Sequence, residues 1–203
     1  MIYLILCFLL GFFNSSLLSL SLSLSPTHLC RPEQSSALLK FKSNLSISIS
    51  IAIYKTRCLG EVHIPSHKTD SWDEGTDCCK WEGVMCDNKK GNVIGLDLSC
   101  NGLIGSLQSN NSLFSLQKLR WLNLAGNDLG ISEIPSEFGK LRSLTYLSLY
   151  GAGFTGFVPP EISLLSDLVS LDLSLNYGLL FRNHNFNMLV HNLTKLENIV
   201  STV

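Results

Sequence analysis

The sequence lacks a surplus of basic residues: 15 Lys and Arg stand against 16 Asp and Glu, for a formal net charge of -1. Nucleic acids and anionic membrane surfaces attract clusters of positive charge, so neither is expected as a partner. The sequence also lacks the catalytic motifs GxSxG and HExxH and a phosphate-binding loop. Its five histidines are scattered without metal-ligand spacing. We therefore expect no catalytic residue, no metal site and no cofactor.

Long apolar runs are absent except at the N-terminus, where residues 2–13 are apolar and residues 1–24 carry no charge. With small residues at Ser21, Ser23 and Ser25, this pattern predicts a secretory signal peptide over residues 1–25. No Lys or Arg precedes the apolar block. A retained membrane anchor is the alternative, which the interrupting serines disfavour. No later stretch approaches the roughly 20 apolar residues of a membrane helix, so the chain as written is expected to be extracellular.

Cysteine is absent after Cys100. Once Cys7 leaves with the signal peptide, six cysteines remain, and an even number in a secreted chain indicates disulfides. Zinc binding is the competing use, but no CxxC pair occurs. Six cysteines allow about 15 pairings, and strain disfavours a bond between neighbours in sequence. The expected disulfide cysteines are Cys30, Cys58, Cys78, Cys79, Cys86 and Cys100.

One pattern recurs four times: an apolar residue, two free positions, Leu, one free position, Leu, two free positions and usually Asn. The copies begin at Val93, Leu119, Leu144 and Leu168, about 24 to 26 residues apart, which is the spacing of leucine-rich repeats. A repeat of this length buries its apolar face only by stacking on its neighbours. The pattern predicts an α/β solenoid, a right-handed superhelix with a parallel β-sheet on its concave face.

The repeats are expected over residues 91–203, as about four copies and a truncated fifth that starts at Leu193. A disulfide-bonded N-terminal helical cap is expected over residues 26–90, because the first coil of a solenoid otherwise exposes an apolar flank. Glu33 to Leu45 has the apolar spacing of an amphipathic helix. Ser46 to Ile53 alternates Ser and Ile, and this period of two suits an edge strand. We favour an insertion loop or a short hairpin of the cap over a binding role for this segment.

Aligned copies form columns that predict the packing. The leucine column is expected to lie side by side in one sheet: Leu96, Leu122, Leu147 and Leu171. Apolar residues three apart, such as Leu113 and Leu116, predict helical or 3₁₀ turns on the return path. A column of buried amides is expected at Asn101, Asn127 and Asn176, with a local irregularity or a water where Ala152 replaces Asn. Tyr177 to Val190 does not fit the repeat and is expected to be a looped insertion.

Positions between the strand leucines face the concave surface, because side chains alternate along a strand. Asp97 and Asp172 are expected three strands apart, on the order of 14 Å, which is too far for a glycosidase pair at roughly 5 to 9.5 Å. Aromatic residues among small polar ones suit protein or peptide recognition. The candidate concave binding face consists of Asp97, Trp121, Asn123, Tyr146, Tyr150 and Asp172. Glycosylation is expected at the sequons of Asn44, Asn110 and Asn192.

The segment from Trp72 to Asp87, with its CCxWxGVxC core, and the repeat tails of the form L/F-x-G-x-I/V-P carry a family resemblance. The chain resembles the N-terminal portion of plant leucine-rich-repeat receptor-like proteins, including cell-surface receptors that confer resistance to fungal effectors. The resemblance implies the pairs Cys30–Cys78 and Cys79–Cys86, which leaves Cys58 and Cys100 as a third pair. It also implies a plasma-membrane location for a full-length receptor and a partner receptor kinase for signalling.

The function expected from this resemblance is a non-enzymatic extracellular recognition module with a protein or peptide ligand, acting in defence signalling. Two alternatives stay open. The first is a secreted inhibitor of a microbial cell-wall-degrading enzyme, of the polygalacturonase-inhibitor type. The second is a non-functional truncated receptor copy. Relatives continue through more repeats, a C-terminal cap and a membrane helix, and we expect the sequence downstream of the last codon to separate these possibilities.

Overall fold

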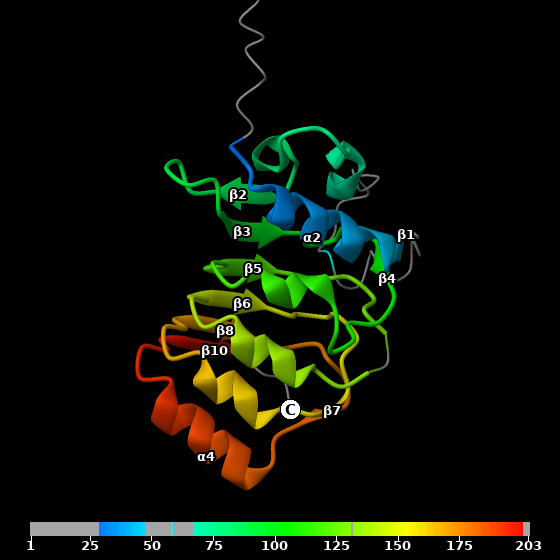
Figure 1. The fold of residues 1–203 in the computed structure, drawn as a ribbon. Coiled ribbons are helices and arrows are strands. Elements are labelled where there is room, and N and C mark those ends of the chain that lie inside the picture. Colours follow the sequence, from blue (N-terminus) through cyan, green and yellow to red (C-terminus); the bar gives the residue numbers. More distant parts are fainter. Residues whose placement is uncertain (1–28, 48–57, 59–66, 131, 201–203) are drawn as a thin grey trace, which may run out of the picture.

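The computed structural model describes residues 29–47, 58, 67–130 and 132–200. The expected signal peptide lies outside the described residues. Coils of the chain stack one on another, with the cap at one end and β10 and α4 at the other (Figure 1). No helix within the described ranges combines the length and the hydropathy that a membrane span needs.

The main sheet confirms the predicted stacking. Its strand order is β10-β8-β6-β5-β3-β2, and all neighbours are parallel except β2 and β3. Leu96, Leu122, Leu147 and Leu171 are register partners across it, as predicted, and Ile199 of the fifth copy continues the column. The strands are β2 (Val84–Cys86), β3 (Val93–Asp97), β5 (Trp121–Asn123), β6 (Tyr146–Ser148), β8 (Ser170–Asp172) and β10 (Asn198–Val200).

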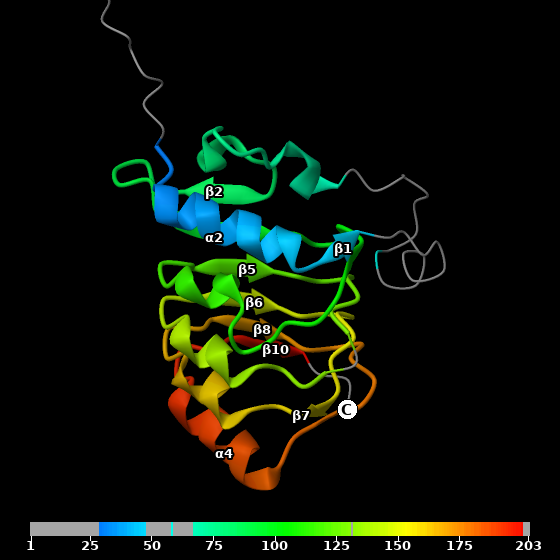
Figure 2. The same cartoon turned by 45° about the vertical axis from the view of Figure 1, so that its right-hand side comes forward.

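The return path of each coil carries a short helix. Together with α2 of the cap, these helices form one row (Figure 2). The residues three apart do form 3₁₀ turns, as predicted; Leu113 is buried in the first and Leu116 ends it. The row consists of α2 (Pro32–Ser43), η3 (Ser112–Ser115), η4 (Ser136–Lys140), η5 (Pro160–Leu164) and α4 (Asn183–Asn192).

The looped insertion expected over Tyr177 to Val190 is wrong. This segment contains strand β9 (Leu179–Leu180) and most of helix α4. The stretch from Asn176 to Leu193 spans 17 positions, against 13 for the equivalent Ala152 to Leu165. The four additional residues are about one α-helical turn, so the coil accommodates them by replacing a 3₁₀ turn with an α-helix.

Short strands on the flank hold the repeat tails together. β7 (Gly156–Phe157) pairs in parallel with β9, and β1 (Ser46–Ile47) pairs antiparallel with β4 (Leu103–Ile104). Ser46–Ile53 was expected to be an insertion loop or a short hairpin of the cap; its first two residues form β1, and residues 48–53 lie outside the described residues.

The cap packs its apolar residues against the first coil. Helix α2 ends two residues before the predicted Leu45 and buries Ala37, Leu38 and Phe41. The rings of Trp72 and Trp81 stack with centroids 5.5 Å apart. Two short 3₁₀ turns complete the cap, η1 (Lys68–Ser71) and η2 (Cys78–Lys80).

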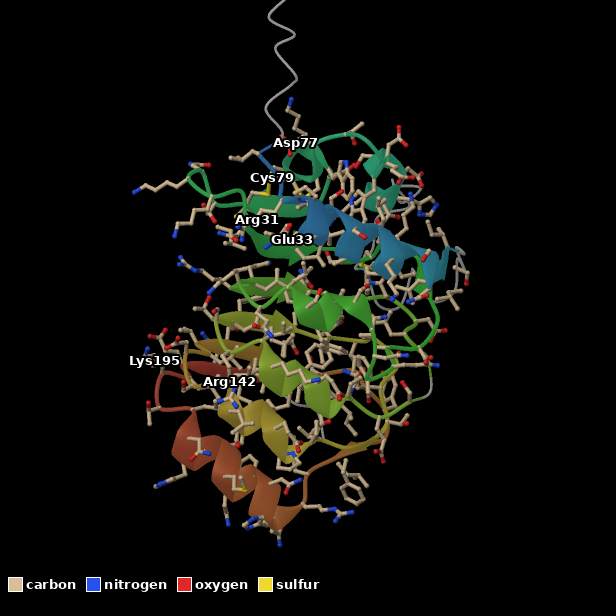
Figure 3. The ribbon with its side chains drawn as sticks, viewed as in Figure 1. Arg31, Glu33, Asp77, Cys79, Arg142 and Lys195 are labelled. Atoms are coloured by element: carbon tan, nitrogen blue, oxygen red, sulfur yellow. A yellow bond between two sulfur atoms is a disulfide. The ribbon has the colours of Figure 1, made fainter. Side chains whose placement is uncertain are left out.

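Three disulfides reinforce this small core, and they join the same pairs that the resemblance implies. The bonds are Cys30–Cys78, Cys58–Cys100 and Cys79–Cys86. Asp77 lies beside Cys79 at the cap end (Figure 3), where Asp77 Oδ1 accepts hydrogen bonds from the Cys30 and Cys79 amides. Crosslinks of this kind supply stability that a small apolar core cannot.

At Asn127 and Asn176, a buried side-chain amide connects its coil to the coil before it. Asn127 Nδ2 donates to the carbonyls of Leu98 and Leu124, and its Oδ1 accepts the Leu103 amide at 3.0 Å. Asn176 repeats this arrangement one coil after the gap in the column. At that gap, the Leu129 amide donates to the backbone carbonyl of Ala152. The expected irregularity is thus a switch from a side-chain to a backbone acceptor.

Asn101, the first amide of the column, bonds the cap instead of a preceding coil. Its Oδ1 accepts the Lys68 amide at 2.5 Å, and its Nδ2 donates to Thr69 Oγ1 at 3.1 Å. Both partners belong to η1. The cap therefore occupies the place that an earlier repeat would take.

Candidate functional site

The concave face is the face of the main sheet turned away from the row of helices. Outward side chains lie in rows across it, because register partners on parallel strands are neighbours. The first row is Met85, Gly95, Trp121, Tyr146, Ser170 and Asn198. The second row is Asp97, Asn123, Ser148, Asp172 and Val200.

Two aromatic side chains of the first row form a stacked pair. The rings of Trp121 and Tyr146 are parallel within 4°, with centroids 3.6 Å apart. Trp121 remains 42% exposed, so one large apolar surface is held in a fixed orientation and is open to solvent. Tyr150 lies four residues further along the same coil and makes no ring contact with this pair in the described part of the chain. Of the three aromatic residues predicted on the concave face, Trp121 and Tyr146 form a pair and Tyr150 is separate from it.

Met85 extends this surface toward the cap. It is the register partner of Gly95, is 59% exposed, and lies over that glycine so closely that a Cβ there would be 3.0 Å from Met85 Cβ. Because Gly95 has no side chain, the Met85 side chain occupies the space over it, next to Trp121 in the row. Sequence reasoning missed Met85, although the alternation of Val84, Met85 and Cys86 signals a strand with one outward residue.

The polar residues of the second row end their strands. Asp97 Oδ1, Asn123 Oδ1 and Asp172 Oδ1 each accept the backbone amide two residues on, at 3.0, 3.1 and 2.9 Å. Side chains of Asp and Asn form this local turn readily. These three predicted binding residues thus have a structural role.

Asp97 is also bonded by the cap. Lys68 Nζ lies 3.1 Å from Asp97 Oδ1, and Ser99 Oγ donates to the same oxygen at 2.7 Å. Burial alone would raise the pKa of Asp97, but the hydrogen bonds from Ser99 and Lys68 outweigh it and hold the pKa below its ordinary value. Asp97 is consequently an ion-paired carboxylate at neutral pH, and it is less available to a ligand than Asp172.

The two carboxylates of the second row are far apart. Asp97 and Asp172 are three strand steps apart in the same row, as expected, so the two carboxyl groups do not share a substrate. One cluster of metal-ligand atom types occurs within the described residues, at Cys30, Cys78 and Cys79. All three sulfurs are in disulfides, and metals bind the thiolate.

The three sequon asparagines are exposed and lie on or beside elements of the outer face. Asn44 follows the last residue of α2, Asn110 precedes η3, and Asn192 is the last residue of α4. None belongs to a strand of the main sheet. Glycans at these positions would leave the Trp121–Tyr146 pair uncovered.

Comparison with known proteins places the cap and the repeats in one group. A family model described as "Leucine rich repeat N-terminal domain" matches residues 31–50 and 60–87. The chain is 42% identical over 148 residues to Receptor-like protein 6 of Arabidopsis thaliana, which covers 73% of this chain and 15% of that protein. It is 40% identical over 184 residues to Receptor-like protein Cf-9 of Solanum pimpinellifolium, covering 90% of this chain and 21% of that protein. The chain thus spans about a fifth or less of the length of these curated relatives.

Solved structures show the same fold. The BIR2 ectodomain of Arabidopsis thaliana has a TM-score of 0.62 at 23% identity, covering 86% of this chain and 83% of that chain. The ectodomain of the Arabidopsis thaliana receptor kinase GASSHO1/SCHENGEN3, solved in complex with Casparian strip integrity factor 2, has a TM-score of 0.58 at 23% identity, covering 82% and 18%. With its cap, its parallel sheet and these relatives, the chain belongs to the plant leucine-rich-repeat receptor-like proteins, as an N-terminal portion.

Proposed function

We propose that this chain is the N-terminal recognition part of a non-enzymatic plant receptor ectodomain, and that its concave face binds a protein or peptide ligand through Trp121 and Tyr146. The observation that carries the proposal is the exposed stack of these two rings on neighbouring strands. Stacking fixes both side chains before a ligand arrives, so binding orders fewer rotatable bonds. Exposed aromatic residues are also the residues that most often dominate binding energy at protein interfaces.

The surroundings of the pair suit a polypeptide ligand. Met85 supplies a flexible apolar side chain on one side, and Ser170 and Asn198 supply hydrogen-bonding groups on the other. Such an apolar centre with a polar border is the usual anatomy of a protein interface. The similar ectodomain of GASSHO1/SCHENGEN3 was solved with Casparian strip integrity factor 2 bound, which supports a polypeptide ligand for this fold.

The wider role follows from the relatives. As part of a receptor-like protein in defence, this surface would face the extracellular space, and a full-length receptor at the plasma membrane would signal through a partner receptor kinase. Cf-9 and Receptor-like protein 6 support the receptor-like assignment by identities of 40% and 42%. No catalytic step is part of the proposal.

The test compares binding by the secreted chain and its variants to apoplastic fluid from fungus-challenged leaves, separated into fractions and measured by biolayer interferometry. Trp121→Ala with Tyr146→Ala is expected to weaken binding to the active fraction by roughly tenfold or more. Tyr177→Ala is the matched control, because Tyr177 is 80% exposed and lies outside the main sheet. Equal binding by the double variant and the parent chain would overturn the proposal. Binding of a microbial cell-wall-degrading enzyme from that fraction, with loss of its activity, would support the inhibitor alternative instead.

A further inference from the structure

A groove of about 670 Å³ lies on the flank of the solenoid, away from the concave face. Four successive coils contribute to it, and three of them do so with the residues that enter the outer-face helix: Ser136 begins η4, Pro160 begins η5, and Arg182 immediately precedes α4. Figure 2 shows this flank on the right of the molecule, beside β7. The volume is in the range of roughly 300 to 1,000 Å³ that ligand sites occupy.

The middle of the groove is apolar and rigid. Phe157 is 38% exposed there, and Ile134, Pro135 and Pro159 form the adjacent wall. Proline has a fixed φ and no amide hydrogen, so this wall presents a preformed apolar surface with few donors of its own. A surface of this kind suits apolar side chains of an extended segment.

Opposite charges border this apolar middle. The guanidinium of Arg182 lies over the Phe157 ring, 4.3 Å from its centroid, which holds the cation at one side of the groove. Glu133 lies against Gly156 on the other side, where its Oε1 would be 2.8 Å from a Cβ. Both side chains are exposed, and neither forms an ion pair within the described residues. The two charges therefore remain available to a bound molecule.

Spacing fixes the length of segment that could use both charges. Glu133 belongs to the second coil, Phe157 to the third and Arg182 to the fourth. Neighbouring strands lie about 4.8 Å apart, so two coil steps cover roughly 10 Å. A segment in the extended polyproline II conformation rises about 3.1 Å per residue with three residues per turn, so residues three positions apart lie on the same face, about 9 Å apart.

We propose that this flank groove docks a segment of a partner protein in the extended polyproline II conformation, in which a basic and an acidic residue are three positions apart with apolar residues between them. The basic side chain meets Glu133, the acidic side chain meets Arg182, and the apolar residues cover Phe157. This site is separate from the concave face, so the chain has two binding surfaces that can be occupied together. An experiment that disproves binding at one surface therefore leaves the proposal for the other surface intact.

Three fluorescein-labelled peptides serve as probes, with the cores Lys-Leu-Val-Glu, Lys-Leu-Val-Lys and Glu-Leu-Val-Glu, and fluorescence anisotropy measures their affinities for the secreted chain. The mixed-charge core is expected to bind most tightly. Arg182→Glu should shift the preference to the core with two lysines, and Glu133→Lys should shift it to the core with two glutamates, each by roughly two- to fivefold. Glu133→Gln should remove the preference for lysine without creating one for glutamate.

Phe157→Ala is expected to weaken the affinity for all three probes by roughly tenfold. Trp121→Ala is the control and should leave these affinities unchanged. Circular dichroism checks that each variant stays folded. If the order of the probe affinities stays the same in Arg182→Glu and Glu133→Lys, or if Trp121→Ala weakens the probes as Phe157→Ala does, the inference is wrong. Concentration-dependent dimers lost in Phe157→Ala, with no binding of any probe, would make a second copy the occupant and also overturn it.

Discussion

Lys68 Nζ lies 3.1 Å from Asp97 Oδ1 and thereby joins the cap to the first repeat at the edge of the concave face. Lys68 begins η1, and Asp97 is the last residue of β3. The Lys68 side chain is 22% exposed, whereas the two members of the surface pair Lys195–Asp167 are 60% and 49% exposed. Arg142 and Lys195 lie on later coils, away from the cap (Figure 3). Solvent therefore screens the Lys68–Asp97 pair less than the Lys195–Asp167 pair.

Lys68→Met is expected to lower the free energy of unfolding by about 1 kcal/mol, near the upper end for a partly exposed ion pair. Lys195→Met should change it by less than about 0.5 kcal/mol. Because the pKa of Asp97 is lowered in the folded chain, the contribution of the pair is present above the ordinary carboxyl pKa and fades as the pH falls through the lowered value. Urea unfolding at two pH values measures both effects. An equal cost for the two Met variants would contradict the difference in screening.

Asn127→Ala and Asn176→Ala are each expected to destabilise the chain by about 3 kcal/mol. Each substitution leaves buried backbone groups of two coils without partners, including the Leu103 and Phe154 amides. Asn198→Ala, at an exposed position of β10, is the control and should stay within about 0.5 kcal/mol. Urea unfolding of the three variants measures the free energies. A cost near that of the control for the buried positions would show that backbone acceptors replace the amides, as happens at Ala152.

The repeat sequence predicts the sheet because one column of leucines is both the sequence signal and the structural register. Leu96 and Leu171 are the first and last leucines of that column, and the structure pairs the whole column in register. The coil after Asn176 was predicted wrongly because the reading relied on a tail motif. Its length, four residues more than that of the preceding coil, was the better signal, since one helical turn absorbs it.

The candidate site was predictable only where it lies on repeats. Alternation along the strands placed Trp121 and Tyr146 on neighbouring positions, and the structure stacks them. Met85 and Lys68 come from the cap, whose path over the first strand has no period in the sequence. Met85 contacts Gly95, 10 residues further along the chain, and Lys68 contacts Asp97, 29 residues further along. No local sequence pattern encodes these tertiary contacts.

The Asp87 carboxylate is expected to titrate at about 2. It accepts hydrogen bonds from the Lys90 amide, the Asn92 side chain and the Lys89 amide, which lower its pKa from 3.8 to about 2. The stability that this turn contributes is present above the ordinary value and is lost as the pH falls toward 2. Carbon-13 NMR of the Asp carboxyl groups measures the midpoint directly. Asp87→Asn should remove that signal, and a midpoint near 4 in the parent chain would contradict the hydrogen-bonded turn.

Glycans are expected at Asn44, Asn110 and Asn192 when the chain is secreted from plant cells. All three positions are exposed, and the sequons have the required Ser or Thr. Mass spectrometry of peptides released before and after glycosidase treatment measures the occupancy of each site. The triple Asn→Gln variant should keep the binding of the parent chain at the concave face. Loss of that binding, with the fold intact, would place a glycan within the recognition surface.

Removing the Cys58–Cys100 disulfide is expected to cost more stability than removing Cys79–Cys86. The bonds join residues 42 and 7 positions apart, and chain-entropy arguments assign about 4 and about 2 kcal/mol to loops of these lengths. Paired Cys→Ser variants, with urea unfolding of each, measure the difference, and mass mapping of unreduced peptides verifies the remaining bonds. The longer crosslink also joins Cys58 to the position just before Asn101, whose amide already bonds η1, so its loss should loosen the junction between the cap and the first repeat. The reverse order of costs would show that strain or residual structure in the unfolded chain outweighs loop closure.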